Sequence, residues 1–100
     1  MPLVIVGTVR VPVDRIADAR PAMDAMVAAS RAEDGCLDYA YAHDIADAGL
    51  IRVMEVWRDR AAFARHVASP HIAAWRAQWP ALGIGERDLR LYEAGEAEAV

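Results

Sequence analysis

The sequence has no lysine and only one cysteine, Cys36, and these two shortages exclude several classes of protein. A single cysteine cannot form a disulfide within the chain, and it excludes a zinc site built from several cysteines. All 11 basic residues are arginines, and 15 acidic residues outnumber them, which gives a formal net charge of −4. Because the bases form no cluster, we expect no nucleic-acid partner.

Long hydrophobic runs are also missing. The apolar N-terminal stretch is soon interrupted by Thr8 and Arg10, and no segment approaches the roughly 18 apolar residues of a membrane span. We also find no basic leader with a cleavage site, so we expect a cytoplasmic protein without a membrane partner. One hundred residues predict a single domain, with a core over residues 3–93 and a tail at 94–100.

Alternating and helical patterns predict the elements of the first half. Leu3–Val13 is rich in β-branched residues and predicts a strand, and Ile16–Glu33 has helical periodicity, with Asp14 as its expected N-cap. Cys36–Ile45 and Leu50–Arg58 predict two further strands, joined as a hairpin by a turn at residues 47–49. Leu37, Tyr39, Tyr41 and His43 are expected on one strand face, with His43 exposed to solvent near the turn.

The second half predicts two helices and a strand. Asp59 is the expected N-cap of a helix that Ser69-Pro70 ends, and Pro70 then begins another helix, which Pro80 limits. Residues 87–93 alternate as a last strand. The order β-α-β-β-α-(α)-β is that of a ferredoxin-like α+β fold with a four-stranded antiparallel sheet. Helices on one face leave the other face open, which predicts a homodimer packed sheet to sheet.

Two local motifs carry a specific resemblance. The first is the segment Glu33-Asp34-Gly35-Cys36-Leu37-Asp38-Tyr39, which is similar to an E-x-G-C-x-x-Y pattern. The second comprises Glu55-Val56-Trp57, Ala62, Phe63, His66 and Ser69-Pro70-His71. Together with the order of elements, these motifs resemble the antibiotic biosynthesis monooxygenase family, over roughly residues 3–93.

The resemblance implies a dimeric α+β barrel similar to the quinol monooxygenases of that family. Such enzymes oxygenate small aromatic, quinol-like molecules with O₂ and use no metal or flavin, so no cofactor is expected. The family also contains haem-degrading enzymes that use an Asn, a Trp and a His. The Trp expected near His66 and the His expected near Arg76 are absent from this sequence, which disfavours haem degradation.

Oxygenation of a phenol without a cofactor requires a base for the hydroxyl proton, donors for the negative charge and an apolar pocket. Histidine suits the base because imidazole is neutral and accepts protons near pH 7. Together with the family resemblance, this makes His66 the candidate catalytic base. It is expected on the helical face that it shares with Phe63 and Val67. The competing interpretation is a half-buried histidine with a purely structural hydrogen bond.

Five further residues are candidates for substrate binding. Trp57, Tyr39 and Tyr41 are expected to line the pocket, while Glu55, among apolar neighbours, needs a partner and could orient His66. His71 is expected in the first turn of a helix, where it could bind or cap, although a structural role is the commoner one. For each of them simple packing is the ordinary alternative, and no ligand spacing predicts a metal site.

Two other functions stay open. One is a non-oxygenase enzyme, such as an isomerase of a small polar metabolite, which would need inward arginines; Arg52 or Arg90 in the pocket would favour it. The other is a non-catalytic dimer that binds a small molecule, favoured by a pocket filled with its own side chains.

Overall fold

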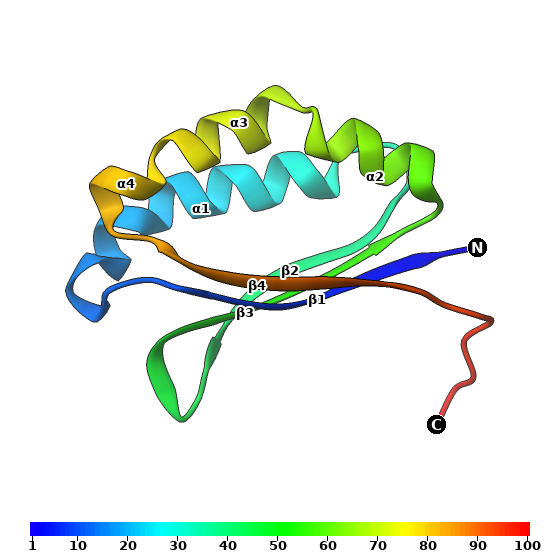
Figure 1. The fold of residues 1–100 in the computed structure, drawn as a ribbon, viewed down its shortest axis with the longest axis horizontal. Coiled ribbons are helices and arrows are strands. Elements are labelled where there is room, and N and C mark those ends of the chain that lie inside the picture. The colour runs from blue at the N-terminus through cyan, green and yellow to red at the C-terminus, as the bar shows by residue number, and fades with distance from the viewer.

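The computed structural model describes residues 1–100, and its elements follow the predicted order. They are β1 (Leu3–Arg10), a 3₁₀ turn (Val13–Arg15), α1 (Ile16–Arg31), β2 (Cys36–Asp44), β3 (Asp47–Trp57), α2 (Arg60–Val67), α3 (Pro70–Ala77), α4 (Trp79–Leu82) and β4 (Gly85–Glu93). The strands form one antiparallel sheet in the order β2-β3-β1-β4. All helices cover one face of this sheet, as Figure 1 shows. The ferredoxin-like α+β fold is therefore confirmed.

The hydrophobic core lies between the sheet and the helices. Its largest fully buried side chains come from three of the strands and from α1 and α3, and they include Trp57, Trp75, Tyr39, Leu3 and Met26. Burial of this apolar surface is the main stabilising contribution to the fold. None of the helices is both long and apolar enough to cross a bilayer.

The turn between β2 and β3 was predicted at the wrong residues. It is formed by Ile45 and Ala46, while β3 already begins at Asp47. The backbone N–H of Ala46 donates to the Asp44 carboxylate at 3.0 Å, which closes the turn earlier than expected. Gly49, the residue that suggested the turn, instead accepts a hydrogen bond from the N–H of Val11 within the extended strand.

The start of α1 and the alternation of β2 also differ from the prediction. Asp14 is not an N-cap: it lies inside the 3₁₀ turn, and α1 begins at Ile16 without a side-chain cap. Leu37 does not share the inward face of Tyr39, because the pairing of β2 with β3 shifts between Cys36 and Asp38. The extra residue turns Leu37 outward, where its side chain is 59% exposed.

The predicted helix signals after β3 are confirmed in position. The Asp59 side chain accepts from the N–H of Ala62 at 2.9 Å and caps α2. The chain breaks at Ser69, and Pro70 is the first residue of α3. Pro80, however, does not end a helix; it lies in the first turn of the short α4.

Candidate active site

His66 is held by the carboxylate of Glu33, a residue that was not among the candidates predicted from the sequence. His66 lies in the last turn of α2 with only 5% of its side chain exposed, and its Nδ1 is 2.5 Å from Oε2 of Glu33. Glu33 lies in the tight turn between α1 and β2. Gly35 makes this approach possible: its φ is +85°, and a Cβ there would lie 2.5 Å from Cβ of Ala62 in α2.

The hydrogen bond from His66 to Glu33 fixes which imidazole nitrogen carries the proton. A carboxylate can only accept a hydrogen bond, so Nδ1–H of His66 is the donor. The tautomer of His66 is inferred from this hydrogen-bond network. Nε2 is then left with its lone pair. It faces Glu55, whose Oε1 is 3.6 Å away, and His66 lines a cavity on that side. This is the arrangement of an oriented general base.

His71 supports Glu33, and it does not line the cavity. Its Nε2 lies 3.1 Å from the same oxygen of Glu33 and 3.2 Å from Oγ of Ser69. The Ser69 hydroxyl also donates to the backbone carbonyl of His66 at 2.6 Å. His71 lies in the first turn of α3, as expected, but it is absent from the cavity lining, so its contacts are those of the structural role and not of the substrate-binding candidate. His71 lies behind Glu33 because α3 begins beyond the Ser69-Pro70 break.

Glu55 and Trp57 form a buried pair beneath His66. Only 4% of Glu55 is exposed, and burial raises the pKa of its carboxyl above the ordinary value. Its partner is the indole N–H of Trp57, which donates to Oε1 at 3.0 Å. The Trp57 ring packs on the imidazole of His66, with centroids 4.5 Å apart. Trp57 is fully buried and absent from the cavity lining, so its expected place in the pocket wall is corrected.

Tyr39 and Tyr41 both line the cavity, as expected, with stacked rings 5.9 Å apart. The hydroxyl of Tyr39 donates to Sδ of Met26 in α1 at 3.3 Å, so it is already engaged. Burial raises the pKa of both tyrosines, and their hydroxyls therefore stay protonated at neutral pH. These two residues give the cavity an aromatic floor and no anionic group.

The cavity has a volume of about 330 Å³ and lies between the sheet and the helices α2 and α3. Its apolar wall comes from Ile5, Phe63, Val67, Ile72, Ala73, Leu89 and Leu91, and its polar groups belong to Tyr39, Tyr41, Glu55, His66, Arg76, Arg87 and Arg90. A larger hollow of about 480 Å³ lies on the open face of the sheet and does not include His66. The smaller cavity therefore contains the candidate chemistry.

Three groups near the base could in principle bind a cation. Ligand atoms of Glu33, His66 and His71 all lie within 4.8 Å of one another, and two imidazoles with one carboxylate suit several transition metals. Two ligands bound tetrahedrally at ~2.1 Å would lie roughly 3.4 Å apart. The 2.5 Å separation of His66 Nδ1 and Glu33 Oε2 instead fits a shared proton. We assign the cluster as a hydrogen-bonded network.

Sequence reasoning missed Glu33, Arg76 and Arg87 as site residues. Glu33 is part of the first motif, but no contact was predicted for it, because its partners His66 and His71 are 33 and 38 residues away in the sequence. Of the two arginines expected as alternatives, Arg52 lies on the open face and pairs with Asp44 at 2.9 Å, while Arg90 borders both the cavity and the open-face hollow, with its guanidinium paired with Asp88. His43 is exposed, as expected.

Comparison with known proteins identifies relatives of this fold. A structure from Deinococcus radiodurans, described as a candidate antibiotic biosynthesis monooxygenase, matches with a TM-score of 0.89 and 27% identity over 100% of this chain and 98% of the other. The structure of Rv0793 from Mycobacterium tuberculosis matches with a TM-score of 0.79 and 31% identity, covering 100% of both chains.

Two sequence relatives extend this comparison. Rv0793, named as a candidate monooxygenase, is 43% identical over 65 residues, 61% of this chain and 63% of its own length. The protein sll1783 of Synechocystis sp., which has no assigned activity, is 25% identical over 99% of this chain and 67% of its own length. In these sequence alignments the chain thus spans about two-thirds of the length of each relative. The sequence model described as "Antibiotic biosynthesis monooxygenase" matches residues 2–78, and on this match the chain belongs to that family.

Proposed function

We propose that this chain is a cofactor-independent monooxygenase that oxidises a small aromatic, quinol-like substrate with O₂. The observation that carries the proposal is the imidazole of His66, whose Nδ1 is held by Glu33 while Nε2 lies 3.6 Å from Glu55, and both His66 and Glu55 line the cavity. Membership of the monooxygenase family and the description of Rv0793 support the oxygenase class. The substrate type and the lack of a cofactor are parts of the proposal.

An anthrone illustrates the chemistry, because its enol form is a phenol. Nε2 of His66 accepts the hydroxyl proton, and the resulting anion transfers one electron to O₂. The two radicals combine at the ring carbon opposite the oxygen, which forms a C–O bond. Loss of the C–H proton and cleavage of the O–O bond then leave a carbonyl and release water. The CH₂ group and O₂ are thereby converted into C=O and H₂O, which balances atoms and electrons.

The other residues of the cavity suit this sequence of steps. Glu33 stabilises the imidazolium that forms when His66 takes the proton. The arginines that line the cavity stabilise the substrate anion, and the apolar wall limits the access of water to the radical pair. The reaction needs no proton from Tyr39 or Tyr41, whose hydroxyls stay protonated.

Oxygen uptake tests the proposal directly. Metal-free and flavin-free protein is mixed with a panel of quinols and anthrones in an oxygen electrode, with heat-denatured protein as the background for autoxidation. We expect uptake above background that is lost in His66→Ala and retained in His43→Ala, which removes an exposed histidine outside the cavity. Equal uptake by wild type, His66→Ala and denatured protein across the panel would refute the oxygenase.

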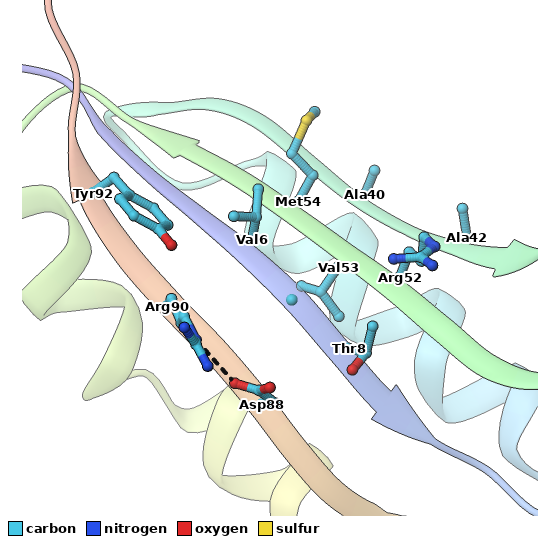
Figure 2. Close-up of a pocket in the computed structure, with 11 residues that line it drawn as sticks. Val6, Thr8, Ala40, Ala42, Arg52, Val53, Met54, Asp88, Arg90 and Tyr92 are labelled. Atoms are coloured by element: carbon cyan, nitrogen blue, oxygen red, sulfur yellow. Dashed lines mark hydrogen bonds and ion pairs between the residues drawn. The ribbon is translucent and has the colours of Figure 1, made fainter.

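We also propose that the open sheet face pairs with a second copy of the chain. Figure 2 shows Val6, Met54 and Tyr92 on this face, and their side chains are 38%, 39% and 52% exposed. Because the charges Arg90 and Asp88 on the same face pair with each other, it can meet its own copy without repulsion. Light scattering should give twice the chain mass, and Met54→Lys should reduce it to one chain. A monomeric wild type at micromolar concentration would refute the dimer.

A non-oxygenase enzyme is the second candidate, because Arg76 and Arg87 line the cavity and such arginines suit a small polar anion. In that case His66 would move a proton next to a carbonyl, without O₂. The open volume of about 330 Å³ weighs against a binding protein whose pocket is filled by its own side chains. The cytoplasmic location expected from the sequence stays a prediction.

A further inference from the structure

Two arginines at the cavity differ from all the others in the chain. Of the 11 arginines, all except Arg76 and Arg87 have a carboxylate within 4.0 Å or, in the case of Arg31, a backbone carbonyl as acceptor. The chain carries more acids than bases, so partners are not scarce. These two guanidinium groups, which have neither kind of partner, both line the cavity that contains His66.

The two cations come from different elements, and Arg76 is held in place. Arg76 lies in α3, and its guanidinium carbon is 5.1 Å from the ring centroid of Trp79, a cation–π contact that orients it. Arg87 lies in β4 and lines the same cavity. Burial and the neighbouring charge of Arg87 both lower the pKa of Arg76. An anion bound between the two groups would remove this repulsion.

No carboxylate of the cavity lining forms an ion pair with Arg76 or Arg87. The only carboxylate in the lining is Glu55, which is bonded to Trp57 and whose pKa is raised by burial, with no contact to either arginine within 4.0 Å. Arg90, the third arginine of the lining, has its own partner in Asp88 at 3.4 Å. The cavity therefore joins an aromatic floor and a base at one side to an uncompensated double positive charge at the other.

We propose that the cavity selects a small aromatic carboxylate, with its carboxylate on Arg76 and Arg87 and its hydroxylated ring over Tyr39 and Tyr41. Two guanidinium groups match the two oxygens of a carboxylate, and this distinguishes such a ligand from a neutral quinol of the same size. The orientation of the ring hydroxyl toward His66 rests on the proposed function. The recognition of the carboxylate does not.

A matched pair of stable probes tests the proposal without any turnover. 6-Hydroxy-2-naphthoate and 6-hydroxy-2-naphthamide have the same ring and the same remote hydroxyl and differ in charge, and binding of each is measured by titration calorimetry at low ionic strength. We expect the naphthoate to bind at least about tenfold more tightly, a preference that weakens as salt is added. Arg76→Gln, Arg87→Gln and the double variant should lose it, while Arg76→Lys should retain part of it.

Arg20→Gln is the control, because it removes the same charge from an exposed residue of α1 that pairs with Asp24. Equal affinity of the wild type for both probes, failure of both to bind at millimolar concentration, or a preference that survives the double variant would each overturn the proposal. Oxygen uptake is a separate readout. A preference for the naphthoate without any oxygen uptake refutes the oxygenase and leaves the recognition of the carboxylate intact.

Discussion

Replacement of Glu33 by glutamine tests whether this residue positions and stabilises the base. The side chains have nearly the same shape, so the amide oxygen can still accept from Nδ1 of His66. The variant removes the negative charge that would lie against the imidazolium after proton transfer. Glu33 does not line the cavity, so substrate binding should be little affected. We expect kcat to fall while KM stays nearly constant.

The size of the effect follows from the geometry. With charge centres about 4 Å apart, an ion pair near a protein surface is worth ~4 kcal/mol at an effective dielectric constant of 20. Because the Glu33 side chain keeps 16% of its exposure, we take about half of that, ~2 kcal/mol. A loss of ~2 kcal/mol of transition-state stabilisation lowers kcat roughly 30-fold.

Two measurements separate this positioning role from a structural one. Oxygen uptake with the best anthrone gives kcat and KM, and long-range ¹H–¹⁵N spectra report which nitrogen of His66 carries the proton. The wild type should show the Nδ1–H tautomer, and Glu33→Gln should show a weakened Nδ1 hydrogen bond. Glu86→Gln, on an exposed carboxylate paired with Arg10, is the control. A kcat within threefold of wild type in folded Glu33→Gln would refute the reasoning.

Three further predictions concern stability. Burial raises the pKa of the Glu55 carboxyl above its ordinary value of 4.5. The folded state therefore holds this proton more tightly than the unfolded chain does. The resulting contribution to stability is present at low pH and is lost as the pH rises through the raised pKa. Glu55→Gln, which keeps an acceptor for Trp57, should therefore gain unfolding free energy relative to wild type as the pH rises above the ordinary value of 4.5 in urea titrations. Gly7→Ala should destabilise the fold by about 3 kcal/mol in the same assay, because its Cβ would lie 1.8 Å from the backbone oxygen of Asp88. Asp59→Ala removes the cap of α2 and should lower the melting temperature by about 5 °C in a thermal scan.

Each stability prediction has an outcome that contradicts it. A difference between Glu55→Gln and wild type that does not change with pH would mean that this carboxyl titrates alike in the folded and unfolded states. Wild-type stability of Gly7→Ala would show that β1 and β4 can separate without cost. An unchanged melting temperature of Asp59→Ala would mean that another group caps α2 in its absence.

The sequence predicted the order of elements well because each carries a local pattern. Alternation in the strands, Asp59 before α2 and the Ser69-Pro70 break are all readable within about ten residues. Errors occurred where one residue changes the pairing of two strands. The shift in β2 that turns Leu37 outward, and the use of Asp44 in the hairpin turn, depend on the register with β3 and leave no mark in the pattern.

The site was predicted less completely because its contacts are long-range. His66 was a candidate from its residue type and its motif, but its partner Glu33 lies on a different element. The arginines were missed for a related reason. An arginine is recognisable as a binding group only when its neighbours leave it unpaired, and Arg76 and Arg87 cannot be distinguished from their paired counterparts until α3 and β4 are placed around the cavity.

The break between α2 and α3 makes the network around Glu33 possible. In one continuous helix His66 and His71, five residues apart, would point about 140° away from each other, since each residue turns the helix by about 100°. The break at Ser69 changes the direction of the chain, so that both imidazoles reach the same oxygen of Glu33. The Ser69 hydroxyl holds this corner through the carbonyl of His66 and through His71. The Ser-Pro-His triplet therefore forms a corner that directs two histidines toward one carboxylate. This explains why the triplet occurs in the same sequence motif as His66, although only His66 lines the cavity.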